Sequence, residues 1–142
     1  MKTSPVTPAD LAASVLSVPP LPLASDLAPD ERQMRRLVGH IEAGGVGTIL
    51  WGGNAQLQHW PASRYGEFLA LAEATAAPES WVIPSVGPDY GKLLDEARSL
   101  AGTRFPCAML LPMAAHHTPA GVVRGVRDFV QAAGRPAIVY IR

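Results

Sequence analysis

The apolar positions of this chain follow two patterns that take turns along the sequence. Short, nearly continuous apolar runs alternate with longer segments in which apolar residues recur every three or four positions. The runs predict buried strands over residues 14–18, 46–51, 81–86, 107–111 and 137–141. The segments between them predict amphipathic helices, and this alternation is typical of parallel strands covered by helices.

The predicted helices have recognisable ends and buried stripes. Asp30 is placed to cap the first of them, and Gly44 follows its last periodic residue. Thr118 and Pro119 form a cap and first-turn pair for the last helix, and Gly134 ends it. The buried stripe predicted for that helix consists of Val122, Val123, Val126, Phe129 and Val130. The two middle helices are predicted to bury Tyr65, Phe68, Leu69 and Ala72, and Leu93, Leu94, Ala97 and Leu100.

The strand and helix pattern repeats about five times, so the fold class is α/β. Right-handed crossovers of this kind lead either to a doubly wound sheet or to a β/α barrel, and periodicity does not separate the two. Residues 1–12 contain Pro5 and Pro8 and no periodic pattern, so we expect a loose N-terminal arm there. Residues 13–142 then form one domain.

Composition places the chain among globular proteins without a charged partner. Hydrophobic residues make up 48% and charged residues 17% of the 142 residues. Twelve basic residues balance twelve acidic ones, which argues against nucleic acid or a membrane as the main partner. The single cysteine, Cys107, lies in an apolar run and is predicted to be a buried thiol in a reducing compartment. With no signal-peptide pattern, we expect a cytoplasmic protein.

The strongest candidate for ligand binding is the turn after the second predicted strand. Gly52, Gly53 and Asn54 follow that strand directly, and glycine leaves backbone amides uncovered for a ligand. Ligands of α/β proteins gather at the carboxyl ends of parallel strands, although a plain strand-to-helix turn is the alternative. His116 and His117 have no further ligands at zinc-like spacing, so no metal site is predicted.

Five motifs in order resemble one known family. They are residues 41–44 (Ile-Glu-Ala-Gly), 52–56 (Gly-Gly-Asn-Ala-Gln), 83–87 (Ile-Pro-Ser-Val-Gly), 111–114 (Leu-Pro-Met-Ala) and 136–140 (Pro-Ala-Ile-Val-Tyr). In this order and spacing they resemble the dihydrodipicolinate synthase and N-acetylneuraminate lyase family. The resemblance implies a (β/α)₈ TIM barrel, of which this chain holds about five β/α units.

The resemblance also implies a chemistry. Members of the family are class I aldolase-type lyases, in which a lysine on the sixth strand forms a Schiff base with pyruvate or a related 2-oxo acid, without a cofactor. By this resemblance Gly52, Gly53 and Asn54 hold the keto-acid carboxylate, and Tyr140 passes protons as the catalytic tyrosine of the fifth strand.

The chain departs from the family pattern at several of these positions. Gly53 lacks a hydroxyl group, and Asn54 cannot relay a proton as a threonine does. Ala114 stands where the lysine-synthesis enzymes carry a tyrosine, and Ile141 replaces an asparagine, so a true dihydrodipicolinate synthase is disfavoured.

The expected lysine of the sixth strand lies beyond Arg142, and neither Lys2 nor Lys92 replaces it, because Lys92 is predicted to lie on a solvated helix face. We therefore expect a partial barrel that is inactive alone and forms a homo-oligomer. The alternative is a small doubly wound domain that binds an anion or is non-catalytic.

Overall fold

The computed structural model describes residues 1–111 and 117–141, and its centre is a parallel five-stranded sheet. The strands are β1 (Leu16–Ser17), β2 (Thr48–Trp51), β3 (Trp81–Val86), β4 (Ala108–Leu110) and β5 (Ala137–Val139). They lie side by side in chain order, and every neighbouring pair is parallel. A doubly wound sheet reverses its strand order at a switch point. The consecutive order therefore shows that the doubly wound alternative is wrong and confirms a partial β/α barrel.

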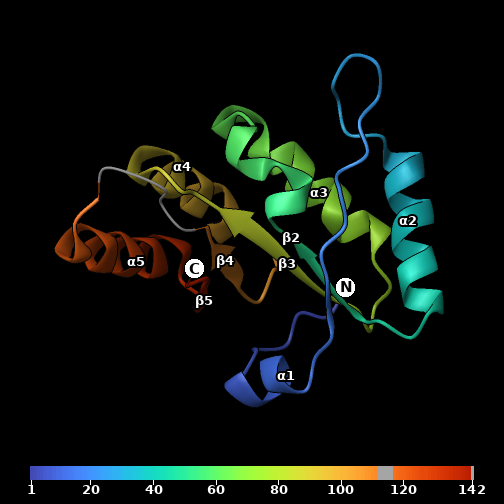
Figure 1. The fold of residues 1–142 in the computed structure, drawn as a ribbon, viewed down its shortest axis with the longest axis horizontal. Coiled ribbons are helices and arrows are strands. Elements are labelled where there is room, and N and C mark those ends of the chain that lie inside the picture. The colour runs from blue at the N-terminus through green and yellow to red at the C-terminus, as the bar shows by residue number, and fades with distance from the viewer. Residues whose placement is uncertain (112–116, 142) are drawn as a thin grey trace.

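The helices that connect the strands cover one face of the sheet. Figure 1 shows α2 (Glu31–Ala43), α3 (Tyr65–Thr75), α4 (Tyr90–Ala101) and α5 (Pro119–Ala133) in an arc along that face. Three short 3₁₀ turns, η1 (Gly53–Ala55), η2 (Leu57–His59) and η3 (Ala62–Arg64), join β2 to α3. The predicted strands and helices are all present, and four of the five strands are shorter than predicted.

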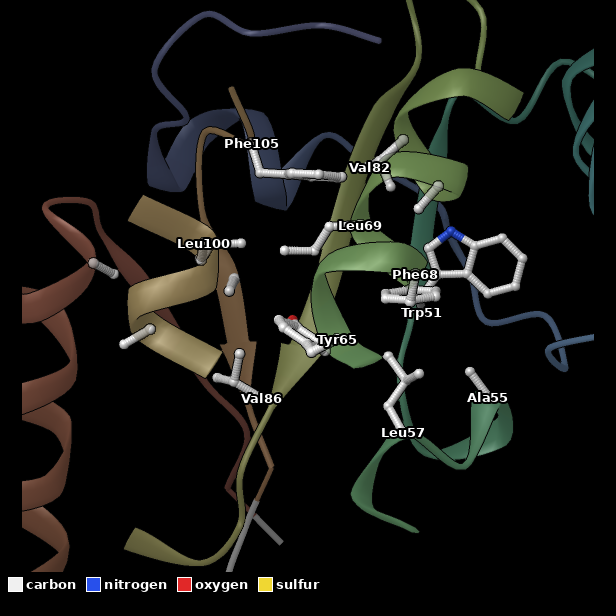
Figure 2. Close-up of a cluster of buried hydrophobic side chains, with 14 of the residues drawn as sticks. Trp51, Ala55, Leu57, Tyr65, Phe68, Leu69, Val82, Val86, Leu100 and Phe105 are labelled. Carbon is white, nitrogen blue, oxygen red and sulfur yellow. The ribbon is translucent and has the colours of Figure 1, made fainter. Parts of the chain in front are cut away.

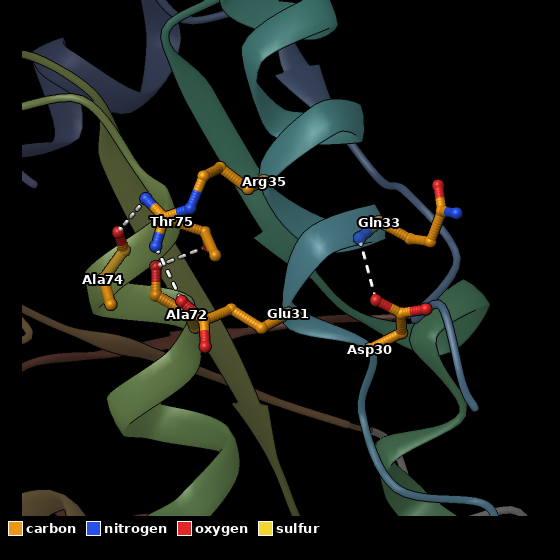
Figure 3. Close-up of polar contacts among 7 residues, drawn as sticks. All are labelled: Asp30, Glu31, Gln33, Arg35, Ala72, Ala74 and Thr75. Carbon is orange, nitrogen blue, oxygen red and sulfur yellow. Dashed lines mark hydrogen bonds and ion pairs between the residues drawn. The ribbon is translucent and has the colours of Figure 1, made fainter.

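The helix ends follow the sequence signals in most cases. The Asp30 carboxylate accepts a hydrogen bond from Gln33 N at 3.0 Å, as Figure 3 shows, and Gly44 is the residue at the end of α2. The Thr118 hydroxyl caps α5 in the same way. Asp89 stands at the cap position of α4, but its side chain makes no capping bond.

The end of α3 is tied to α2 by a surface contact. Arg35 of α2 donates a hydrogen bond to the Ala74 carbonyl at 2.9 Å and pairs with Glu31 at 2.8 Å (Figure 3). All three arginines of α2 are exposed. Such an exposed ion pair adds little to stability, so the buried face of α2 carries most of its attachment.

The main core fills the layer between the helices and the sheet. Figure 2 shows Tyr65, Phe68 and Leu69 of α3 in this layer, beside Trp51 of β2. The rings of Trp51 and Phe68 meet edge to face, with centroids 6.0 Å apart. The Tyr65 hydroxyl donates to the Ser85 carbonyl at 2.9 Å, and burial holds the pKa of Tyr65 well above its usual range. Tyr65 therefore stays a hydrogen-bond donor that fixes α3 to β3.

The opposite face of the sheet, called the inner face below, carries a second apolar cluster. It consists of Leu50, Trp81, Ile83, Cys107 and Met109. Burial raises the pKa of the Cys107 thiol to about 11, so it stays protonated at neutral pH. This agrees with the predicted buried thiol.

The N-terminal segment packs against the inner face. Val6 and Leu11 contact the inner cluster, and the Lys2 amide donates to the Ser80 carbonyl at 2.7 Å, just before β3. Within this segment α1 (Pro8–Ala12) begins at a capping box between Thr7 and Asp10. Residues 8–12 of the expected loose arm thus form a short helix, which these local bonds and apolar contacts hold.

The predicted buried stripe of α5 is only partly correct. Phe129 is fully buried, but Val122, Val123 and Val130 are 39%, 59% and 37% exposed. The buried residues of α5 are Gly125, Phe129 and Ala133. The described residues cover only the side of α5 that faces the sheet and α4, so the outer valines meet solvent.

Candidate functional site

The turn after β2 lies at the carboxyl end of the sheet, as predicted. Gly52 is buried, with φ −107°, and an added Cβ would lie 3.2 Å from the Met109 methyl group. Gly53 is exposed and has open space around its α-carbon. Neither glycine has a positive φ. Gly52 therefore does not adopt a left-handed conformation, and its α-carbon packs closely against the end of the Met109 side chain.

Two exposed residues of this turn have backbone amides without an acceptor in the described part of the chain. Gly53 and Asn54 begin η1, whose first internal bonds come from Ala55 N to the Gly52 carbonyl at 3.0 Å and Gln56 N to the Gly53 carbonyl at 3.1 Å. Among residues 1–111 and 117–141, no carbonyl or side chain accepts from the amides of Gly53 and Asn54. Two neighbouring N–H donors of this kind suit an anion.

The side chain of Asn54 has a structural partner. Its Nδ2 donates to the Val18 carbonyl at 2.8 Å, just past the end of β1. This bond ties the turn to the neighbouring strand end and uses one of the amide hydrogens of Asn54. The backbone of Asn54 therefore suits a ligand better than its side chain does.

Tyr140 lies at the same end of the sheet but in a separate part of it. Its backbone amide donates to the Leu110 carbonyl at 3.3 Å, and the residue is 49% exposed. Tyr140 and His117 line a largely apolar cavity of about 590 Å³ among β4, β5, α4 and α5. None of the described lining residues comes from β2 or its turn. Four matched or candidate residues, Pro112, Met113, Ala114 and His116, lie outside the described residues.

The structure reveals a buried ion pair that sequence reasoning placed in solvent. The Lys92 side chain is 14% exposed and that of Glu96 is 0% exposed, and Nζ lies 2.7 Å from Oε1. Lys92 also donates to the Trp60 carbonyl, and Glu96 accepts from the Gly87 amide at 2.7 Å. The prediction of a solvated Lys92 is wrong because the β2–α3 connection folds over this part of α4. The spacing of four residues predicts that Lys92 and Glu96 pair with each other, but it does not predict that the pair is buried.

The ion pair of Lys92 and Glu96 is costly to bury, and each of its side chains also bonds to a backbone group. Burial raises the pKa of the Glu96 carboxyl group, although Lys92 and the Gly87 amide act in the opposite direction. Gly87 has φ +84°, a conformation that favours glycine, at the turn between β3 and α4. Through Trp60 and Gly87, the pair joins the segment that follows the candidate turn to the carboxyl end of β3.

Metal-ligand clusters and membrane-spanning helices are both missing from the described residues. No group of three His, Cys, Asp or Glu side chains within them is arranged to hold a metal ion. In the same part of the chain, no helix is long and apolar enough to cross a membrane.

The fold resembles solved structures of one family, whereas no family model and no curated protein matches the sequence. Dihydrodipicolinate synthase from Bacillus clausii aligns with a TM-score of 0.78 and 18% identity over 91% of this chain and 45% of its own. N-acetylneuraminate lyase from Proteus mirabilis aligns with a TM-score of 0.79 and 15% identity over 89% and 45% of the two chains. A prophage protein of the dihydrodipicolinic acid synthase family from E. coli K12 was solved in complex with pyruvate. It aligns with a TM-score of 0.79 and 12% identity over 92% of this chain and 45% of its own.

These likenesses identify the fold as an N-terminal-like portion of the TIM barrel of the dihydrodipicolinate synthase and N-acetylneuraminate lyase family. The chain spans about half the length of the solved relatives that it matches. The resemblance predicted from the five ordered motifs is thus confirmed at the level of the fold.

Proposed function

We propose that this chain provides the carboxylate-binding part of a site for pyruvate or a related 2-oxo acid. The observation that carries the proposal is the pair of exposed amides of Gly53 and Asn54, which have no acceptor among the described residues, at the carboxyl end of β2. Amide donors that face an anion form strong hydrogen bonds. The complex of one structural relative with pyruvate supports this choice of ligand.

The reaction class in this proposal is that of a Schiff-base lyase, an aldolase or a dehydratase, with Tyr140 as the residue that passes protons. The changes at Gly53 and Asn54 favour a family reaction other than that of dihydrodipicolinate synthase. A non-catalytic relative that retains only the anion site is the second candidate, and the departures at these positions favour it.

Neither lysine of this chain is placed to form the Schiff base, so we propose that the chain alone has no lyase activity. A lysine must lose its proton to attack a carbonyl group. The Lys92 ammonium group instead forms an ion pair with Glu96 and bonds to the Trp60 carbonyl. Lys2 lies before the start of β3, at the opposite end of the strands from the candidate turn.

A titration with pyruvate followed by amide NMR tests the binding proposal. We expect the amide signals of Gly53 and Asn54 to move with pyruvate, while that of Gly47, before β2, stays in place. Gly53→Ala keeps the amide and adds a methyl group in open space, so it should bind pyruvate as the original chain does. Unchanged signals at Gly53 and Asn54 with saturating pyruvate would overturn the proposal.

The same sample gives a chemical control. Borohydride treatment in the presence of pyruvate should leave the mass of the chain unchanged, because neither lysine is placed to form an adduct. A stable pyruvate adduct on Lys92 or Lys2 would show that this assignment is wrong.

We also propose that the chain forms a homo-oligomer. Val139 of the edge strand β5 and Ile141 just after it are 44% and 87% exposed, and Val122 of α5 lines the same cavity as both. Apolar surface of this kind next to an open strand edge favours association. Light scattering after gel filtration distinguishes an oligomer from a monomer.

A further inference from the structure

The two smallest residues of the inner face lie side by side at the carboxyl end of the sheet. Trp51 of β2 pairs with Pro84 of β3, so the next residues, Gly52 and Ser85, are neighbours across the two strands. Ser85 also pairs with Met109 of β4. Because Ile83 belongs to the inner cluster, strand alternation places Ser85 on the inner face too.

The Met109 side chain lies across this pair of small residues. A Cβ at Gly52 would meet the Met109 methyl group at 3.2 Å, although β3 separates β2 from β4. The thioether therefore reaches across β3 at the level of Ser85. We call the space above Gly52 and Ser85 the trough; the end of the Met109 side chain occupies it, beside Val18. Methionine has three rotatable bonds and repacks easily, so the filling group is a movable one.

The Ser85 hydroxyl has no hydrogen-bond partner in the described part of the chain. Ser85 is 0% exposed, and its Oγ makes no hydrogen bond to the residues that the structure describes. Its backbone carbonyl is already used by Tyr65, so only the side chain is unsatisfied. A buried hydroxyl without a partner lowers stability relative to alanine. Residues that are costly to the fold in this way are typical of ligand sites.

We infer that the trough of Gly52 and Ser85 is a ligand subsite, and that Ser85 Oγ–H donates a hydrogen bond to a carboxylate oxygen of the bound 2-oxo acid after Met109 turns aside. This inference rests on the proposed function and adds a residue to it. Ser85 stands one strand further into the sheet than the amides of Gly53 and Asn54. The carboxylate then accepts from the β2 turn and from β3 together.

The variant Ser85→Ala tests the inference through two effects of opposite sign. Without ligand, Ser85→Ala should raise the melting temperature by about 3 °C, because it removes an unsatisfied polar group. Its affinity for pyruvate should fall by about tenfold, because a hydrogen bond to a charged group is lost. Ser99→Ala, on the outer side of α4, is the matched control and should leave the affinity unchanged.

The methyl signal of Met109 gives a direct view of the filling group. In protein labelled at the methionine methyl groups, pyruvate should shift the Met109 signal, which Met109→Leu identifies by its disappearance. In Ser85→Ala the same shift should require about tenfold more pyruvate.

The outcomes separate this inference from the proposed function. If pyruvate moves the Gly53 and Asn54 amides but leaves the Met109 methyl signal or the Ser85→Ala affinity unchanged, the subsite is wrong and the amide site stands. If Ser85→Ala melts at a lower temperature, the hydroxyl has a partner inside the protein and the inference is also wrong. If pyruvate moves none of these signals, the proposed function fails and the subsite fails with it.

Discussion

Replacing Glu96 with alanine is expected to lower the free energy of unfolding by about 3 to 5 kcal/mol at neutral pH. The variant leaves the Lys92 ammonium group without its counter-ion in a site where only 14% of the side chain is exposed. It also removes the acceptor of the Gly87 amide and leaves a cavity under α4. Each of these changes is costly because it leaves a buried group without the partner that it has in the original chain. Urea unfolding followed by circular dichroism measures the effect.

Asp95→Ala provides the matched control on the same helix. Asp95 pairs with Arg98 at 2.7 Å, but both side chains are well exposed, so its removal should cost less than about 1 kcal/mol. Equal losses for Glu96→Ala and Asp95→Ala would mean that burial of the first pair contributes nothing. Glu96→Gln keeps an acceptor for the Gly87 amide, so its loss in the free energy of unfolding should lie between those of the other two variants.

Most of the local structure of this chain can be predicted from its sequence. The strand Trp81–Val86 has the predicted bounds, and the helix Tyr90–Ala101 lies where a buried stripe was predicted, because apolar runs and helical periodicity are local signals. The order of strands is not local. Barrel and doubly wound folds share the same repeating unit, and only the consecutive pairing of β1 to β5 separates them. The ordered family motifs supplied that information where periodicity could not.

The candidate site was predictable in position but not in its contacts. Gly52 stands at a strand end, as its sequence context indicates, but the methyl group that packs closely against it belongs to Met109, on a strand two positions away. The partner of Asn54 is likewise the distant Val18 carbonyl. Ser85 resembled an ordinary strand residue, because its missing partner becomes visible only when the strands are in register. Cross-strand register is therefore the information that the sequence pattern lacked.

The burial of the ion pair of Lys92 and Glu96 could not be predicted from the sequence pattern either. Lys92 and Glu96 stand four residues apart, a spacing that on most helices marks a solvated pair. Burial of this pair depends on the β2–α3 connection, whose Trp60 carbonyl accepts from Lys92. A long connection of three 3₁₀ turns has no periodic signal that predicts where it lies. The same connection begins at the proposed carboxylate site, so the stability of the pair and the position of that site are linked.

Replacing Lys92 with methionine is expected to lower the free energy of unfolding by about 3 kcal/mol at about pH 7.5, and by clearly less at about pH 5. Methionine keeps the apolar volume of the lysine stem but leaves the buried Glu96 carboxylate without a counter-ion. Burial already raises the pKa of Glu96 above its ordinary value of 4.5, and Lys92 opposes that rise. Without Lys92 the pKa of Glu96 in the folded protein rises further.

The sign of the pH dependence follows from proton binding. Between the ordinary pKa of a glutamate and the raised pKa of Glu96, the folded variant binds more protons than the unfolded chain does. Its free energy of unfolding therefore rises as the pH falls through this range, and the gap to the original chain narrows. Urea unfolding at the two pH values measures the gap. Arg98→Met, which breaks the exposed pair with Asp95, is the control and should give a small gap at both. A gap for Lys92→Met that stays constant or widens on acidification would show that Glu96 does not take up the proton, and that the loss of stability comes from packing alone.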